Sequence, residues 1–383
     1  MVRFSKSIIE SAPYPFKKVN DIKAEYIKKG IKVIDLGVGD TTLSAPAGAV
    51  EALKKAVENP ANHHYNFYNG YPFFREAAAV WMERRHGVKL DPEKEITALI
   101  GTKEGLFRVS SAFIDTGDIA IVPGPAYPAV QSGIETAGGS AYFIPQRIEN
   151  GFLPDLSEIP ENIKNKAKYI YINYPNNPTT GTMNAEFAKE LLSRAQKYDW
   201  AVISDMAYSE VYEDSRNISL LELPGAIERV IEFHSLSKTF SMTGFRIGFA
   251  AGAAGIISAL VKIKAIRGSS VFQPVQAAGA YAMLNCDDYL VNMQYYYKNN
   301  RTLLKSIFSK NGIEYFDSGS TFYVWAKVPD GLTSMEFAAL MIEKHGTVIT
   351  PGSLLGNEGE GWFRACFACK TEDLIEFGGR LRL

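Results

Sequence analysis

The sequence predicts an α/β protein with a mainly parallel sheet covered by helices on both faces, followed by a smaller α+β domain. Short apolar strands alternate with helical segments through the middle of the chain, which is typical of sheets buried on both faces. This alternation ends near residue 283, where a long polar helix begins. The chain has 383 residues, of which 46% are apolar, enough for two or three domains with cores of their own.

Hydrophobic periodicity predicts the elements in chain order. Residues 1–20, which are polar and rich in proline, are predicted to form an extended arm. A strand at 31–36 precedes helices at 47–58 and 73–86. The alternating region comprises helix 104–115, strand 119–122, helix 127–137, strands 141–144 and 169–173, helix 184–198, and strands 201–204 and 230–234. The last part holds strand 322–328, helix 334–345, a further strand and a final helix.

The change of pattern near residue 283 sets the predicted domain division. We expect a large domain at 47–282 and a small domain made of 21–46 together with 283–383, because the N-terminal segment is predicted to return to the C-terminal part. The arm at 1–20 lies outside both domains. No internal repeat or low-complexity linker marks these boundaries.

Composition narrows the classes of function. The net charge is −1, so nothing favours nucleic acid or an anionic membrane as a partner. No run approaches the roughly 20 apolar residues of a membrane helix, and the N-terminus lacks the apolar core of a signal peptide. Three cysteines fit a reducing compartment, so a cytoplasmic protein is expected. Cys366 and Cys369 form a C-x-x-C without a second pair, which favours buried thiols over a metal site.

The segment with the strongest chemical pattern is Ser235-Leu236-Ser237-Lys238, which follows an apolar strand and precedes Gly244-Phe245-Arg246-Ile247-Gly248. A lysine beside two hydroxyls is well placed to form a Schiff base, while the hydroxyls and Arg246 can hold a phosphate. Desolvation and nearby positive charge would lower the pKa of Lys238 and leave more neutral amine. Alone, S-x-S-K is typical of a surface loop, but the G-F-R-x-G that follows favours the chemical interpretation.

Three further segments carry polar groups at the ends of predicted strands. Asn173–Gly181 lies where open α/β sheets bind ligands, although such a string is usually a turn. Asp205, in Asp205-Met206-Ala207-Tyr208, can pair with a protonated pyridine nitrogen, although alone it suggests a helix cap. Gly101-Thr102-Lys103 begins a helix whose free N–H groups attract phosphate, or it is only a capped helix start.

The order and spacing of Asn177-Pro178-Thr179, Asp205-x-x-Tyr208, Ser235-x-Ser237-Lys238 and Arg246 resemble those of pyridoxal-phosphate-dependent aminotransferases of fold type I, classes I and II. The resemblance covers nearly the whole chain and is closest to the LL-diaminopimelate and aspartate-type group. The strings that carry this closer likeness are Pro13–Phe16, Asp35–Thr42, Gly151–Leu156 and Asn173–Pro178. It implies the fold of that family, with a mainly parallel seven-stranded sheet in the large domain.

The resemblance also implies a role for each matching residue around pyridoxal 5'-phosphate. Lys238 forms the Schiff base, Asp205 holds the pyridine nitrogen, and Tyr208 and Asn177 donate to the phenolic oxygen. Tyr127 stacks on the ring, unless it is only a turn aromatic packed on the core. The residues implied around the phosphate are Thr102, Lys103, Ser235, Ser237 and Arg246. Ser237 alternatively braces its loop.

Three more positions follow from the resemblance. Arg364 binds the substrate α-carboxylate, which a planar guanidinium suits, unless it is an edge-strand arginine facing solvent. Gly39 approaches the same carboxylate through its backbone and also binds substrate, or it is an ordinary turn glycine. Tyr65 reaches the phosphate of the neighbouring subunit, which implies an isologous homodimer, or it is an ordinary loop tyrosine. Asn177 is implied in substrate binding as well, and no metal is expected.

Some positions depart from the family pattern. Thr180 replaces a glycine in the N-P-T-G motif, which questions the path of that loop. Leu43-Ser44-Ala45-Pro46 departs from the usual substrate loops, and the stretch Tyr68–Tyr71 is also altered. These departures leave the amino donor open among LL-diaminopimelate, aspartate, alanine, methionine and N-succinyl-diaminopimelate.

The implied activity is transfer of an amino group from an amino acid such as LL-diaminopimelate or aspartate to 2-oxoglutarate by a ping-pong mechanism. The same scaffold supports C–S β-lyases, which release ammonia and pyruvate without a second oxo acid, so this alternative stays open. A non-catalytic regulatory module is disfavoured because the motifs begin within the first 40 residues, which leaves no room for a DNA-binding domain.

Overall fold

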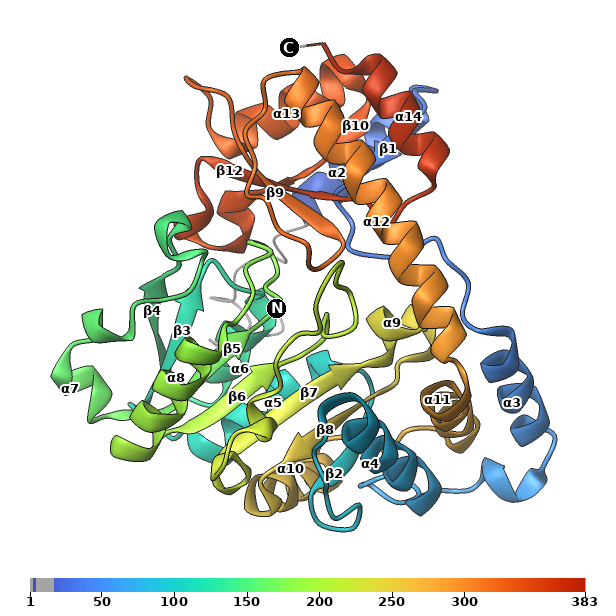
Figure 1. The fold of residues 1–383 in the computed structure, drawn as a ribbon, viewed down its shortest axis with the longest axis vertical. Helices are drawn as coiled ribbons and strands as arrows, with labels where there is room; N and C mark the ends of the chain where they lie inside the picture. Colours follow the sequence, from blue (N-terminus) through green and yellow to red (C-terminus); the bar gives the residue numbers. More distant parts are fainter. Residues whose placement is uncertain (1–2, 5–16, 383) are drawn as a thin grey trace.

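A seven-stranded sheet forms the centre of the computed structural model, which describes residues 3–4 and 17–382 (Figure 1). The strands lie in the order β2-β8-β7-β6-β5-β3-β4, and they are parallel except for β8, which runs antiparallel to both its neighbours. The mainly parallel seven-stranded sheet is therefore confirmed. Its strands are β2 (Ile96–Leu99), β3 (Ile119–Gly124), β4 (Ser140–Pro145), β5 (Ala167–Asn173), β6 (Ala201–Asp205), β7 (Val230–Ser235) and β8 (Gly248–Gly252).

Helices cover both faces of this sheet. One face packs against α5 (Thr102–Phe113), α6 (Pro128–Thr136) and α10 (Ala254–Arg267). The other face packs against α4 (Pro72–His86), α8 (Ala185–Lys197) and α11 (Gln273–Asn285), and α3 (Ala47–Val57) lies on α11. Strand side chains alternate between the two layers, so that Val202 and Ile203 of β6 belong to opposite cores. This double burial explains the unbroken apolar runs in the sequence.

A second, smaller sheet stands above the carboxyl ends of the parallel strands (Figure 1). It has the order β11-β12-β9, and the central strand β12 (Trp362–Cys366) runs antiparallel to both β11 (Thr350–Pro351) and β9 (Tyr323–Lys327). Beside it, β1 (Ile34–Asp35) pairs in parallel with β10 (Thr347–Val348). The helices of this part are α13 (Ser334–His345) and α14 (Thr371–Arg380).

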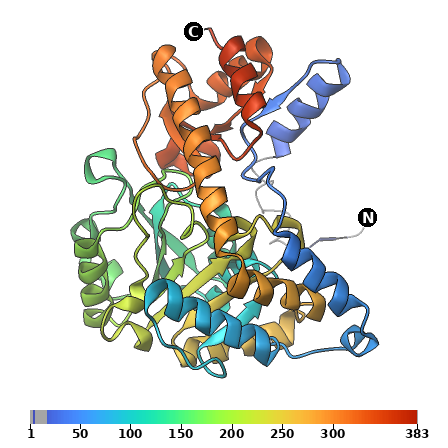
Figure 2. The same ribbon diagram turned by 45° about the vertical axis from the view of Figure 1, so that its right-hand side comes forward.

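Helix α12 (Asp287–Lys310) connects the two sheets along its length (Figures 1 and 2). Near its start the Tyr289 hydroxyl donates to Ser241 Oγ at 2.6 Å, and further along Asn300 Nδ2 donates to the Phe367 carbonyl at 3.0 Å. Since one helix contacts both parts of the chain, no irregular linker is needed between them. This agrees with the lack of a composition signal, and the domain boundaries stay a prediction.

A cluster of aromatic side chains also packs the two parts of the chain against each other. Phe152 is buried with its ring edge-on to Phe316 and Trp362, with ring centroids 4.9 and 5.5 Å apart. Trp362 in turn stacks on Trp325 of β9. Phe152 has a positive φ of 60°, a conformation that a bulky side chain adopts only when its surroundings hold it there.

The sequence analysis missed or misplaced several elements, and helices α10 and α11 were not predicted at all. Helix α2 (Lys17–Lys28) begins inside the predicted extended arm, so that prediction is wrong for residues 17–20. Strand β8, with the sequence Gly-Phe-Ala-Ala-Gly, has little intrinsic strand propensity and forms because it is buried between β2 and β7. Strand β1 is shorter than its predicted range of 31–36. The Pro13–Phe16 string and most of the arm lie outside the described residues. Across the part of the chain that is described, no helix is long and apolar enough to span a bilayer.

Candidate active site

A cavity of about 570 Å³ lies between the carboxyl ends of β5, β6 and β7 and the smaller sheet, a size typical of small-molecule sites. Parallel strands bring their carboxyl ends to one edge, so side chains from distant motifs meet there. All the predicted site residues except Tyr65 line this cavity: Gly39, Thr102, Lys103, Tyr127, Asn177, Asp205, Tyr208, Ser235, Ser237, Lys238, Arg246 and Arg364.

Lys238 enters the cavity from α9 (Leu236–Thr239), the short helix that follows β7. Its Nζ donates to the Gly39 carbonyl at 2.6 Å and lies 5.3 Å from the centre of the Phe322 ring. Burial lowers the pKa of Lys238, the carboxylate of Asp40 opposes this, and the cation of Arg364 adds to it. The lowered pKa increases the fraction of neutral amine, the form that acts as nucleophile or base.

Asp205 is a buried carboxylate at the end of β6 whose hydrogen-bond donors are neutral. Its Oδ1 accepts from the Ala207 amide at 3.1 Å, and the Tyr171 hydroxyl lies 3.4 Å from Oδ2. Burial raises the pKa of Asp205 to about 7, although both donors act in the opposite direction. A carboxylate in this state gains most from a cationic partner such as a protonated pyridine nitrogen.

Arg364 extends from β12 of the smaller sheet into the same cavity. Its Nη1 donates to Asn177 Oδ1 at 2.6 Å, its Nη2 donates to the Gly37 carbonyl at 2.8 Å, and its guanidinium lies 4.2 Å from the Tyr323 ring centre. Its Nε is buried without a hydrogen-bond partner. A carboxylate bound beside Nε would satisfy this donor with a charge-assisted bond.

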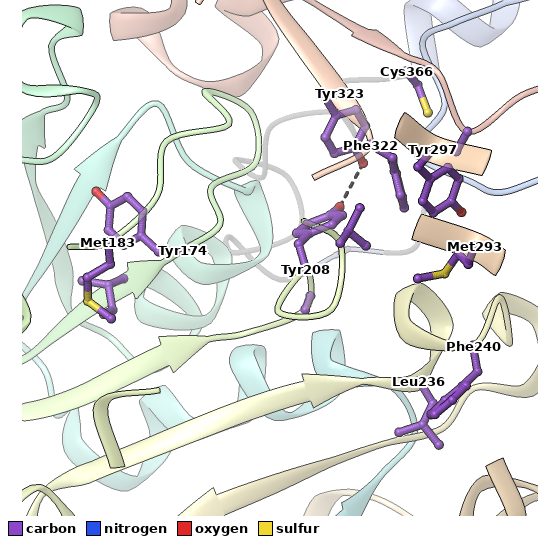
Figure 3. Packing of buried hydrophobic residues seen from close by; sticks show 14 of the residues in the cluster. Tyr174, Met183, Tyr208, Leu236, Phe240, Met293, Tyr297, Phe322, Tyr323 and Cys366 are labelled. Carbon is purple, nitrogen blue, oxygen red and sulfur yellow. Dashed lines mark hydrogen bonds between the residues drawn. The ribbon is translucent and has the colours of Figure 1, made fainter. Parts of the chain in front are cut away.

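Tyr323 of β9 is a cavity residue that the sequence analysis did not single out. Its hydroxyl and that of Tyr208 lie 2.9 Å apart, and Figure 3 shows the two rings pointing toward each other. A Cβ added at Gly39 would overlap the Tyr323 hydroxyl, so any other residue there would displace the Tyr323 side chain. Thr350 also lines the cavity and was missed. Both sit in apolar strands, where sequence alone does not reveal which strand face meets the cavity.

The Asn173–Gly181 loop keeps the path of a glycine-containing motif despite Thr180. Thr180 is buried with a φ of 64°, the left-handed conformation that glycine adopts without strain. Its amide donates to the Asn176 carbonyl at 3.0 Å, and its own carbonyl accepts from Ser318 Oγ at 2.6 Å. The smaller part of the chain therefore braces this loop, and Asn177 remains in the cavity.

An anion cradle forms at the start of α5. Gly101 has a φ of 71°, and any Cβ there would overlap the Arg246 guanidinium, so Arg246 lies against this helix end. Arg246 itself has a φ of 54°, and its Nη1 donates to the Thr243 carbonyl at 2.9 Å. Ser235 and Ser237 approach from the end of β7. The positive end of the helix dipole, a guanidinium and hydroxyl groups together suit a phosphate.

Comparison with known proteins identifies the protein family of this chain. Residues 31–378 match the family model described as aminotransferase class I and II. The chain belongs to this family. It is a pyridoxal-phosphate-dependent aminotransferase with the fold of type I, as its resemblance implied. The buried carboxylate, the lysine of lowered pKa and the anion cradle fit the ring nitrogen, the aldehyde and the phosphate of that cofactor.

Two curated relatives of this aminotransferase share its full length. An LL-diaminopimelate aminotransferase of Aquifex aeolicus is 44% identical over 100% of this chain and 99% of its own. One of Moorella thermoacetica is 42% identical over 99% of this chain and 97% of its own. Among solved structures, substrate-bound BacF from Bacillus subtilis has a TM-score of 0.96 at 34% identity, covering 99% of this chain and 97% of its own.

Tyr65 and the two C-terminal cysteines do not line the cavity of their own chain. Tyr65 follows a short 3-10 helix (Pro60–His63), and its side chain is fully exposed. Cys366 and Cys369 are buried free thiols, and burial raises the pKa of the Cys366 thiol to about 11. Within residues 3–4 and 17–382, no group of three or more His, Cys, Asp and Glu side chains is arranged to hold a metal ion.

The raised pKa of Asp205 predicts that the folded state of the cofactor-free enzyme is destabilised at high pH. Asp205 titrates near pH 3.8 when unfolded and near 7 when folded, so the folded state loses stability as pH rises through that window. We expect Asp205→Asn to raise the thermal midpoint of the cofactor-free protein at pH 8 but not at pH 4. With cofactor bound the sign reverses, because Asn offers no charge to the ring nitrogen.

Thermal unfolding of both forms at the two pH values measures this effect. The matched control is Asp115→Asn, which alters an exposed carboxylate remote from the cavity and should leave both midpoints unchanged. Equal midpoints for Asp205→Asn and wild type at pH 8, with and without cofactor, would contradict the assignment of Asp205.

Proposed function

We propose that this aminotransferase moves an amino group from LL-diaminopimelate to 2-oxoglutarate, binding the two substrates in turn at one cavity. The proposal depends on one observation. The full-length relatives from Aquifex aeolicus and Moorella thermoacetica, which are 44% and 42% identical to this chain, are both named LL-diaminopimelate aminotransferase. An exposed carboxylate on the cavity rim, Asp40, adds support. LL-diaminopimelate carries a distal ammonium group that Asp40 would attract, whereas aspartate has none.

The proposed roles of the cavity residues toward the cofactor follow their chemistry. Lys238 would bind the aldehyde covalently, and Asp205 would hold the ring nitrogen in its protonated form. Pyridoxal phosphate then supplies an electron-accepting ring, the chemistry that side chains lack. Tyr208 and Asn177 would donate to the phenolic oxygen, and Tyr127 would pack on the ring. The phosphate would lie among Thr102, Lys103, Ser235, Ser237 and Arg246.

The chain's own groups would bind the substrate and move one proton. Arg364 would grip the α-carboxylate through its unpartnered Nε and the adjacent Nη2, with Gly39 and Asn177 beside the same group. Lys238, released by the incoming amine, would accept the proton from Cα as a neutral base and would then donate a proton at the former aldehyde carbon instead of at Cα. Its lowered pKa supports this, and a positioned base typically contributes about 10²–10⁴-fold in rate.

The same Arg364 would serve the amino donor and the oxo-acid acceptor in turn. Both molecules carry an α-carboxylate, and the cavity has a single buried arginine with an unpartnered Nε among its described lining residues. Two substrates that share one carboxylate site cannot bind together, so the first product must leave before the second substrate enters. Parallel lines in double-reciprocal plots are the kinetic signature of such an order.

Half-reactions with single amino acids test the proposed donor. Adding LL-diaminopimelate to the purified enzyme should bleach the visible absorbance of the bound cofactor faster than L-aspartate, L-alanine, L-methionine or N-succinyl-LL-diaminopimelate does, because Asp40 favours a distal ammonium group. Adding 2-oxoglutarate should restore the absorbance. Lys238→Ala should lose both the absorbance band and turnover.

Two results would overturn the donor assignment. Faster bleaching by any of the other four amino acids would replace LL-diaminopimelate with that donor. Release of pyruvate and ammonia from cystathionine, without an added oxo acid and at a higher rate than transamination, would favour the C–S β-lyase instead.

Removal of the Arg364 guanidinium tests the shared carboxylate site. We expect Arg364→Ala to raise KM for the donor and for 2-oxoglutarate by similar factors of about 10²-fold, since a charge-assisted bidentate contact contributes roughly 2–3 kcal/mol. Steady-state kinetics with each substrate varied in turn measures both constants. Arg194→Ala, which removes an arginine paired with Glu190 on α8, is the control. A change in only one of the two KM values would show that the donor and 2-oxoglutarate do not share the Arg364 site.

We further propose that two copies of the chain form a homodimer in which Tyr65 completes the phosphate site of the neighbour. The Tyr65 ring is fully exposed in the single chain, and Phe67 and Tyr68 on the same loop are exposed as well. Three exposed aromatic side chains on one loop favour a surface that a second copy of the chain covers. Sedimentation should give twice the chain mass, and Tyr65→Phe should weaken cofactor retention about tenfold while Tyr295→Phe, an exposed tyrosine on α12, does not. A monomer with full cofactor retention would refute this assembly.

A further inference from the structure

The loop Gly37-Val38-Gly39 contacts two charged residues of the cavity through its backbone. The Gly37 carbonyl accepts from Arg364 Nη2 at 2.8 Å and from Thr350 Oγ1 at 2.9 Å. The Gly39 carbonyl accepts from Lys238 Nζ at 2.6 Å. The direction of these two peptide groups therefore decides where the guanidinium and the amine are held. A loop with two glycines has too much conformational freedom to set those directions by itself.

Asp35, immediately before the loop, supplies the constraint. Its Oδ1 accepts from the amides of Gly37 and Val38 at 2.8 and 3.1 Å. Its Oδ2 accepts from Lys23 Nζ of α2 at 2.6 Å. Strand pairing of Asp35 with Val348 anchors the residue itself, and a Cβ on Gly37 would lie 2.9 Å from the Val348 side chain. One carboxylate thus orients two successive peptide groups of the loop.

Asp35 acts without touching the cavity. It is absent from the residues that line it, and its side chain is about one-fifth exposed on the far side of the loop, next to Lys23. Without the Oδ1 acceptor, the Gly37 and Val38 amides would turn toward water, and the Gly37 carbonyl would turn with the Val38 amide because the two belong to one planar peptide group. Arg364 Nη2 would then lose one of its acceptors and its fixed orientation.

We propose that Asp35 is a positioning residue for transamination: through the Gly37 carbonyl it holds Arg364 in the geometry that grips the substrate α-carboxylate. The assignment rests on the proposed role of Arg364 in binding the α-carboxylate. Lys23 pairs with Oδ2 on the other side of the carboxylate, a partly exposed ion pair that contributes little. The backbone hydrogen bonds, rather than the charge of Asp35, carry the effect.

Three variants of the holoenzyme separate these contributions. Asp35→Ala removes the hydrogen bonds to the two loop amides and also the ion pair with Lys23. Asp35→Asn keeps an oxygen that can accept from the two loop amides and loses the ion pair. Lys23→Met loses only the ion pair, and its matched control is Lys29→Met, which breaks a pair with Glu25 on the same helix. Each is tested in half-reactions with LL-diaminopimelate, L-aspartate and L-glutamate, which share the α-amino acid group, and with 2-oxoglutarate after amination.

We expect Asp35→Ala to raise the half-saturating concentration by a common factor of about tenfold or more for every donor that reacts and for 2-oxoglutarate, because small displacements in a positioned site cost up to about 10²-fold. The limiting rate should fall less than the half-saturating concentration rises. The visible absorbance of the bound cofactor should persist, since Asp35 contacts none of its proposed ligands. Asp35→Asn should recover values within about threefold of wild type, and Lys23→Met should stay within the same range.

Two results would overturn the proposal. One is an Asp35→Ala enzyme with unchanged half-saturating concentrations. The other is an Asp35→Asn enzyme as impaired as Asp35→Ala, which would assign the effect to charge. If the wild-type enzyme fails to react with all three donors, the proposed function fails instead. In that case the binding of 3-phenylpropionate, a simple carboxylate, is measured for wild type and for Asp35→Ala. A tenfold higher dissociation constant in Asp35→Ala still supports the positioning role.

Discussion

Desolvation of three charged side chains in one cavity is the constraint on which the rest of this structure depends. Asp205, Lys238 and Arg364 come from three distant stretches of chain and are withdrawn from water together. Burial shifts the pKa of Asp205 up and that of Lys238 down, so in both cases it disfavours the charged form. A cofactor with a basic ring nitrogen and an aldehyde, and a substrate with a carboxylate, complement all three groups.

Two different sheets bring these groups together. The parallel sheet delivers Asp205 and the Lys238 segment to its carboxyl edge, while Arg364 arrives from the antiparallel sheet above. The contacts between the two parts therefore belong to the chemistry as well as to stability. The Phe152 ring packs against Phe316 and Trp362, and the Ser318 hydroxyl donates a hydrogen bond to the Thr180 carbonyl in the loop that also holds Asn177. The loop after β1 completes the arrangement through Asp35.

The parts of the fold and site that the sequence predicted are those with a local signal. Buried strands appear as short apolar runs, and motifs such as Ser235–Lys238 stand directly at strand ends, so chemistry and position are encoded within a few residues. Tyr323, Thr350 and Asp35 carry no such signal, because a polar side chain in a strand or loop has many ordinary uses. Strand β8 escaped for the opposite reason: its glycines and alanines disfavour a strand, and only burial between two neighbours makes it one.

By itself the sequence determined the fold class and the family, and it predicted which side chains would meet the cofactor, because each of these depends on residue type and spacing along the chain. Tertiary structure alone decided which of those side chains share a cavity, which carbonyls hold Arg364 and Lys238, and how far burial moves the pKa of Asp205. The physical reason is that desolvation and hydrogen-bond direction depend on atoms more than a hundred residues away. Contacts between residues so far apart in the chain leave no local pattern in the sequence.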